Sequence, residues 1–191
     1  MAKKALVRFI LPLELEVITD TFTNFSKKDF VNFYKNSDFF LCKLEPGEQN
    51  SSETFRTMET PENFGINKNP SKQFFYDIAW SDIDWQNTAW KNQGYKLKIG
   101  IGRAFVPQVQ MVVNNLSVSK WHGQLIKKSE TYLYQDIEST NGTKINYNKI
   151  ESNKAVPVKS GDVFLFGNTE NEFTFLNVQD FYRYLELINR K

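Results

Sequence analysis

Short apolar segments follow one another along residues 73–178, with turn residues between them at a spacing of roughly ten residues. The segments are rich in aromatic and β-branched residues, which favour strands. They cover residues 73–80, 94–102, 109–113, 123–128, 131–137, 143–150, 163–167 and 173–178. Residues that tolerate turn conformations join them, among them Asn141-Gly142 and Ser160-Gly161-Asp162. This pattern predicts an antiparallel β-sandwich or barrel.

The end of the chain has a different period. Phe181, Leu185 and Ile188 lie at positions i, i+4 and i+7, and basic residues follow them. This spacing predicts a short amphipathic C-terminal helix over residues 179–191, which we expect to cap one end of the main β domain at residues 73–178.

The first 72 residues lack the regular strand pattern and are expected to form an α/β or irregular N-terminal extension. Residues 6–18 predict a strand. Ser26 precedes an apolar pattern of helical spacing and is expected to cap a short helix that presents Phe30, Phe33 and Tyr34. Residues 45–72 are polar and without periodicity, so we expect a long loop there.

The composition and net charge indicate where the protein is expected to be located and which classes of partner it is not expected to bind. The 191 residues are 40% hydrophobic and 15% aromatic, which favours a folded chain over a disordered one. The net charge of +2 gives no general attraction to nucleic acid or to membranes, so we expect neither as a partner. The single cysteine, Cys42, suits a reducing compartment, and Arg8, Pro12 and Glu14 interrupt the N-terminal apolar stretch. We therefore expect an intracellular protein, in the cytoplasm or the nucleus.

Residues 118–122, VSKWH, contain the single histidine of the chain and suggest a Ser119–His122 catalytic pair. The segment lacks a Gly-x-Ser-x-Gly elbow, and positions i and i+3 of an extended segment point to opposite faces. One histidine and one cysteine do not supply a metal cage, and no nucleotide-binding glycine motif is present. We expect no catalytic residue, no metal and no cofactor, and therefore no enzyme.

Trp80, Trp85 and Trp90 raise the alternative of base stacking, as in proteins that bind single-stranded nucleic acid. Basic residues do not alternate with them, and Asp82 and Asp84 are their neighbours. We expect these tryptophans to pack in the core or to pair across strands.

One set of short motifs keeps a fixed order along the chain. Gly102-Arg103 comes first, followed by Ser119-Lys-Trp-His122 and by Asp136 with Ser139-Thr-Asn-Gly-Thr143. Asn146, Gly161-Asp162 and Gly167 complete the series. Each motif alone is weak, but together and in this order they resemble the forkhead-associated (FHA) domain, over residues 73–178.

The resemblance implies an FHA-like antiparallel β-sandwich that binds phosphothreonine peptides through loops at one end. A phosphate group of charge about −1.5 to −2 needs a cation, hydroxyl groups and backbone N–H groups. By resemblance, the peptide-binding residues are Arg103, Ser119, Lys120, Thr140 and Asn141. Gly102, His122 and Gly142 are then expected to support the loops. Lys120 stands where arginine or another polar residue is common in the family, and it supplies charge without a planar fork.

Two functions follow from these expectations. The first is a phosphothreonine-binding adaptor whose N-terminal extension or C-terminal helix holds a second protein. The second is a structural subunit that uses the sandwich as a packing module inside a larger assembly, with phosphate binding secondary or lost. The complete set of predicted binding residues favours the adaptor.

Overall fold

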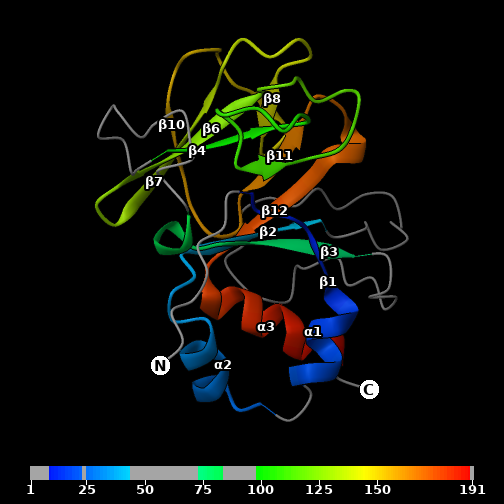
Figure 1. Cartoon of the computed structure of the whole chain (residues 1–191). Coiled ribbons are helices and arrows are strands. Elements are labelled where there is room, and N and C mark those ends of the chain that lie inside the picture. Colours follow the sequence, from blue (N-terminus) through cyan, green and yellow to red (C-terminus); the bar gives the residue numbers. More distant parts are fainter. Residues whose placement is uncertain (1–8, 23–24, 44–72, 84–97, 190–191) are drawn as a thin grey trace.

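The computed structural model describes residues 9–22, 25–43, 73–83 and 98–189, and their strands form two sheets (Figure 1). One sheet has the order β1 (Leu13–Glu14), β3 (Phe74–Ile78), β2 (Phe39–Lys43), β12 (Glu172–Leu176), β11 (Val163–Phe166), β8 (Thr143–Ile145) and β9 (Asn148–Lys149). The other has the order β10 (Val156–Val158), β7 (Thr131–Asp136), β6 (Gly123–Lys128), β4 (Lys98–Gly102) and β5 (Met111–Val112). The predicted predominantly β fold is confirmed.

The prediction of a wholly antiparallel arrangement is wrong at one place. β4 and β5 pair in parallel, with Ile101 opposite Met111 and Gly102 opposite Val112, whereas the other paired strands that the structure describes are antiparallel. Ile10 continues this parallel arrangement beyond β5 with a single bridge to Met111. The five-stranded sheet is therefore mixed.

The two sheets share one hydrophobic core. The seven-stranded sheet contributes aromatic and aliphatic side chains, including Phe39, Leu41, Tyr76, Phe164, Phe166, Phe173 and Phe175. The five-stranded sheet contributes Ile99, Ile101, Met111, Leu125, Tyr134 and Val158. Because β4, β6 and β7 are fixed by this packing, the loops that leave their ends start from rigid positions.

β2, which belongs to the predicted N-terminal extension at residues 1–72, lies in the middle of the seven-stranded sheet, between β12 and β3. Phe39 and Leu41 belong to the core between the sheets. Phe40 and Cys42 point to the opposite face and belong to a second apolar cluster. The extension thus supplies a strand that is buried on both faces.

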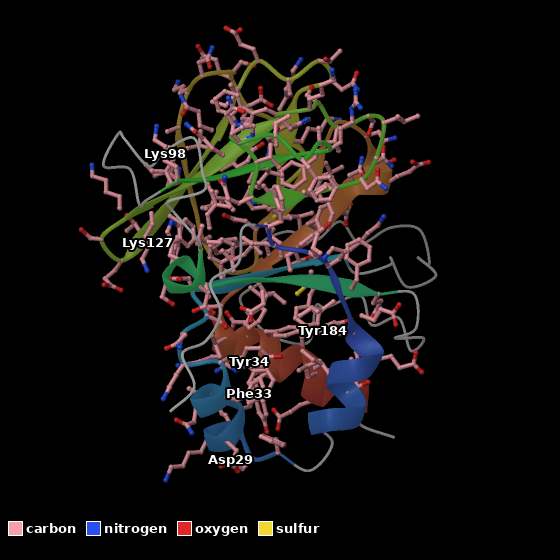
Figure 2. All side chains as sticks on the ribbon, viewed as in Figure 1. Asp29, Phe33, Tyr34, Lys98, Lys127 and Tyr184 are labelled. Atoms are coloured by element: carbon pink, nitrogen blue, oxygen red, sulfur yellow. The ribbon has the colours of Figure 1, made fainter. Side chains whose placement is uncertain are left out.

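Three helices cover the outer face of the seven-stranded sheet (Figure 1). They are α1 (Leu15–Phe22), α2 (Lys27–Phe33) and α3 (Val178–Asn189). Short 3₁₀ helices occupy Trp80–Asp82 and Thr169–Asn171. Figure 2 shows Tyr34 and Tyr184 between the helices and the sheet, where both side chains are buried.

The C-terminal helix is present, with Phe181 and Leu185 buried and Ile188 partly buried, as the spacing predicts. It packs on the outer face of the sheet, against α2 and β2, and does not cap an end of it. The reason lies in the sheet itself: β2 presents Phe40 on that face, and the Phe181 ring lies 4.3 Å from the Phe40 ring.

The N-terminal predictions have mixed outcomes. The helix after Ser26 is confirmed, since the Asp29 N–H donates to the Ser26 hydroxyl at 3.2 Å at its start. The strand expected over residues 6–18 is wrong in the described part, because only Leu13–Glu14 form a strand, Ile10 forms a single bridge, and a helix begins at Leu15. Leu15 and Ile18 are both buried at helical spacing, so packing against the sheet selects the helix.

Several expectations fall on other parts of the chain. The polar segment 45–72, together with Asp84, Trp85 and Trp90, lies outside the described residues. Trp80 is buried beside Phe39 and Tyr132, in agreement with the predicted core role. No helix in the described ranges is long and apolar enough to cross a membrane.

Candidate functional site

Ser119 and Thr140, from two different loops, meet at the centre of the candidate site. The Thr140 backbone N–H donates to the Ser119 hydroxyl oxygen at 3.0 Å, and the two side-chain oxygens lie 3.4 Å apart. The loop of Ser119 joins β5 to β6, and the loop of Thr140 joins β7 to β8. The contact places two hydroxyl groups side by side, with Thr140 exposed and Ser119 partly exposed.

Arg103 follows β4 and joins the same group of residues. Its backbone N–H donates to the Ser119 carbonyl oxygen at 3.0 Å. This bond joins the segment that follows β4 to the loop of Ser119. The Nε atom of Arg103 is buried and makes no hydrogen bond to the described residues. A guanidinium group carries five N–H donors, and that of Arg103 makes no hydrogen bond to the described residues.

Gly102 allows this close approach. A Cβ atom at Gly102 would lie 2.2 Å from the carbonyl oxygen of Lys120 and 3.0 Å from the Cα atom of Trp121. Since both neighbours are backbone atoms, a side chain would force the two segments apart. The sequence expectation that Gly102 supports the site thus has a steric basis.

His122 is fully buried beneath the loops and is joined to them by both ring nitrogens. Nδ1 accepts the Ser119 N–H at 3.1 Å, so the proton of the neutral ring lies on Nε2, which donates to the Thr143 hydroxyl at 3.1 Å. That hydroxyl donates to Asp136 at 2.7 Å, and the Tyr134 hydroxyl lies 3.0 Å from it. This chain of hydrogen bonds links the Ser119 loop to the Thr140 loop from below.

The electrostatics of this network favour a neutral imidazole. Burial lowers the pKa of His122 below its ordinary 6.5, and the negative charge of Asp136 offsets the effect only in part. Burial also acts to raise the pKa of Asp136, but hydrogen bonds from Ser139, Thr143 and Ser152 outweigh it and lower that pKa. Asp136 is therefore ionised, and its charge is used inside the protein rather than against Arg103.

His122 is unsuited to catalysis with Ser119. Its ring contacts the backbone N–H of Ser119, whereas the hydroxyl of that serine faces Thr140. A general base must reach the proton that it removes, and this one does not. In the described part of the chain, no group of three or more metal-binding side chains is present either.

Asn141 and Gly142 complete the Thr140 loop. The Asn141 amide donates to the carbonyl oxygen of Ser117 at 2.8 Å, although the Asn141 side chain is exposed. Gly142 has a φ of +77°, a conformation that a side chain would oppose. Asn141 is thus held at an exposed turn of this loop.

Ser117 and Asn171 also support the loops, and sequence reasoning did not identify either. The Asn171 amide lies within hydrogen-bonding distance of the Ser117 hydroxyl, at 2.7 Å, and of the Phe166 carbonyl oxygen, at 3.0 Å. Asn171 is 54 positions from Ser117. Neither residue stands in one of the motifs, so the sequence holds no local indication of this contact.

Lys120 lies on the exposed side of the Ser119 loop. Neither Lys120 nor Arg103 forms an ion pair with any residue in the described ranges. The structure thus brings the Ser119 and Thr140 hydroxyl groups together on loops that adjoin or carry the cationic residues Arg103 and Lys120, while the carboxylate of Asp136 is hydrogen-bonded inside the protein. This combination of groups suits a doubly charged, oxygen-rich anion.

The remaining motifs, Asn146 and Gly161-Asp162, shape the neighbouring turns. The Asn146 side-chain Nδ2 donates to Asp162 at 2.9 Å, and its side-chain oxygen Oδ1 accepts the Val163 N–H at 2.9 Å. Asp162 also accepts the Lys159 N–H at 2.8 Å. These residues fix the end of β11 and the β8–β9 turn, and they lie outside the group of candidate binding residues.

Comparison with known proteins points to one family. Residues 99–167 match the family model of the FHA domain. No curated protein matches the chain.

Among solved structures, the chain is similar to Mycobacterium tuberculosis EmbR in complex with a low-affinity phosphopeptide, at 27% identity and a TM-score of 0.37. That match covers 42% of this chain and 20% of EmbR, so the chain spans about a fifth of that relative. It is also similar to the FHA domain of an Arabidopsis thaliana protein, at 26% identity over 41% of this chain and 64% of the other, with a TM-score of 0.36. The FHA domain of a Chlamydia trachomatis protein matches at 18% identity over 73% and 97%, with a TM-score of 0.41.

Proposed function

We propose that the chain, whose residues 99–167 match the FHA family model, binds phosphothreonine peptides in a phosphorylation-dependent protein–protein interaction. The observation that supports this most strongly is the meeting of Ser119 and Thr140 beside Arg103, which has no carboxylate partner among the described residues. An anionic ligand would supply the negative charge that these three residues can bind. The domain is proposed to be a sandwich built mainly from residues 73–178 and completed by β2 from residues 1–72, with residues 179–191 as a helix on its outer face.

In this proposal each residue has one role. Arg103 and Lys120 bind the phosphate oxygens through charge-assisted hydrogen bonds, and the Ser119 hydroxyl donates to the same group. Thr140 lies beside the phosphothreonine, and Asn141 binds the backbone of the peptide and so sets its register. Gly102, His122 and Gly142 keep these groups in place. Three or four such bonds, reduced by the costs of association, correspond to a dissociation constant on the order of micromolar.

The adaptor proposal includes a second partner that binds the N-terminal extension or the C-terminal helix. The apolar side of α3 is already occupied, because Phe181, Tyr184 and Leu185 are buried against the sheet and the other helices. A partner at α3 would therefore contact its polar side, and Phe33 of α2, which is 63% exposed, offers an apolar contact nearby. We propose this surface for the second partner. In a pull-down, the Phe33→Ala variant should recover less of the second partner than the wild-type chain does.

Peptide titration tests the phosphothreonine proposal. A peptide that contains phosphothreonine should bind the full chain, while its unphosphorylated and phosphoserine forms bind at least about tenfold more weakly. Arg103→Ala should abolish the difference, because it removes the cation that the phosphate contacts. Arg183→Ala is the matched control, since Arg183 lies on α3 and pairs with Asp180. Equal binding of the three peptides, or binding unaffected by Arg103→Ala, would refute the proposal.

A further inference from the structure

Lys149 lies beside the Thr140–Gly142 loop, although no sequence motif includes it. A Cβ atom at Gly142 would lie 3.2 Å from the Cε atom of Lys149 and 3.9 Å from its Nζ atom. The ammonium group therefore lies next to the loop that carries Thr140 and Asn141. Gly142 is two positions beyond Thr140, a distance of at most about 7 Å along the backbone.

Lys149 belongs to the hairpin formed by β8 and β9, and this hairpin places a second lysine opposite it. In the register of β8 and β9, Lys144 pairs with Lys149, and both side chains are exposed. Antiparallel partners project to the same face, where two like charges repel each other. Their repulsion favours any anion that binds between or beside them.

No carboxylate compensates these two charges within the described residues. Neither Lys144 nor Lys149 forms an ion pair there. The carboxylates of the surrounding turns contact other groups: Glu151 pairs with Lys154, and Glu172 accepts the Tyr147 hydroxyl. The hairpin thus adds positive charge beside the loop that carries Thr140 and Asn141.

We propose that Lys149, assisted by Lys144, binds a second anionic group on the phosphothreonine ligand, located a few residues from the phosphothreonine. The group is an aspartate or glutamate carboxylate or a second phosphate, since all present anionic oxygens to an ammonium group. The inference rests on the proposed phosphothreonine binding and specifies its ligand as an acidic or doubly phosphorylated segment.

Peptide scanning against the full chain tests this. One series of phosphothreonine peptides has neutral flanks, a second carries one aspartate at each flanking position in turn, and a third carries a phosphoserine there. An unphosphorylated peptide with acidic flanks is the fourth arm. We expect at least one acidic position to increase affinity about threefold or more over the neutral peptide, as an exposed ion pair does. A larger gain for phosphoserine would identify the second phosphate as the preferred group.

The Lys149→Gln variant should bind the acidic and neutral phosphothreonine peptides alike. Lys128→Gln removes the same charge from an exposed lysine at the far end of β6 and should keep the preference. If wild type binds acidic and neutral phosphothreonine peptides equally, this inference is wrong while the proposed function stands. If no phosphothreonine peptide binds, the proposed function fails and the inference fails with it. A preference that survives Lys149→Gln would also refute the role of Lys149.

Discussion

At the scale of single residues, His122 shows how a reactive side chain becomes a structural one. Its two nitrogens connect the Ser119 backbone to the Thr143 hydroxyl, and its ring is fully buried. Both contacts require the neutral form, in which one nitrogen accepts and the other donates. The stability of the site loops is therefore linked to the protonation of this residue.

This linkage predicts a pH dependence with a definite sign. The pKa of His122 is lowered on folding, so its contribution to stability is complete above the ordinary value of 6.5. As pH falls below that value, the unfolded chain takes up a proton that the folded chain resists, and the free energy of unfolding decreases. We therefore expect wild type to be less stable at about pH 5.5 than at about pH 7.5, with the loss falling below about pH 6.5.

The His122→Gln variant is the comparison, because the chain has no other histidine. It should be less stable than wild type at neutral pH by about 1–3 kcal/mol, since buried groups lose their partners. It should also lose less stability on acidification. Glu172, whose pKa burial raises, titrates in both proteins, so the difference between them isolates His122. Urea unfolding at the two pH values measures this, and parallel pH profiles would contradict the account.

At the scale of elements, β2 determines how the N-terminal segment relates to the rest of the fold. Its residues pair with β12 on one side and with β3 on the other. Phe39, Phe40, Leu41 and Cys42 are all fully buried. Full burial of an apolar side chain contributes about 1.5–3 kcal/mol, which for several residues approaches the net stability of a domain.

A fragment of residues 73–191 therefore should not fold stably. It lacks β2, leaves the edges of β3 and β12 unpaired, and exposes the inner sides of both apolar clusters. We expect little cooperative thermal unfolding by circular dichroism and strong binding of a hydrophobic dye. Leu41→Ala in the full chain is the milder test and should cost about 2–5 kcal/mol. A cooperatively folded fragment with wild-type stability would contradict the role assigned to β2.

The elements also show what sequence patterns do and do not reveal. Most strands after residue 97 follow from aromatic and β-branched residues between turns, although β10 was not predicted. Phe39–Lys43 has no alternation because the strand is buried on both faces. Leu13 and Leu15 alternate with glutamates and suggest a strand, yet Leu15 and Ile18 satisfy helical spacing as well. Packing against the sheet selected the helical period over the strand period, and the local sequence does not indicate that packing.

The candidate site was more predictable than these elements. Gly102, Ser119 and Thr140 are identified by the order of short motifs, and the structure brings them together. The contacts of Ser117 with Asn171 and of Lys149 with Gly142 join distant or unmarked positions, so they depend on the register of strands rather than on composition.

At the scale of the whole molecule, two surfaces are separated. The helices lie on the outer face of the seven-stranded sheet, and β8, which follows the Thr140 loop, lies at the opposite end of the view in Figure 1. A ligand at the loops would leave the helices accessible. This arrangement suits an adaptor that holds one protein through its phosphothreonine and another through a different surface.

The most direct test of the central claim is a two-dimensional NMR titration of the full chain with a phosphothreonine peptide. The account predicts large shift changes for the backbone amides of Arg103, Ser119, Thr140 and Asn141, with little change in α3. The unphosphorylated peptide at the same concentration should leave these amides unshifted. Absent changes at the loops, or equal changes with both peptides, would contradict phosphothreonine recognition at this site.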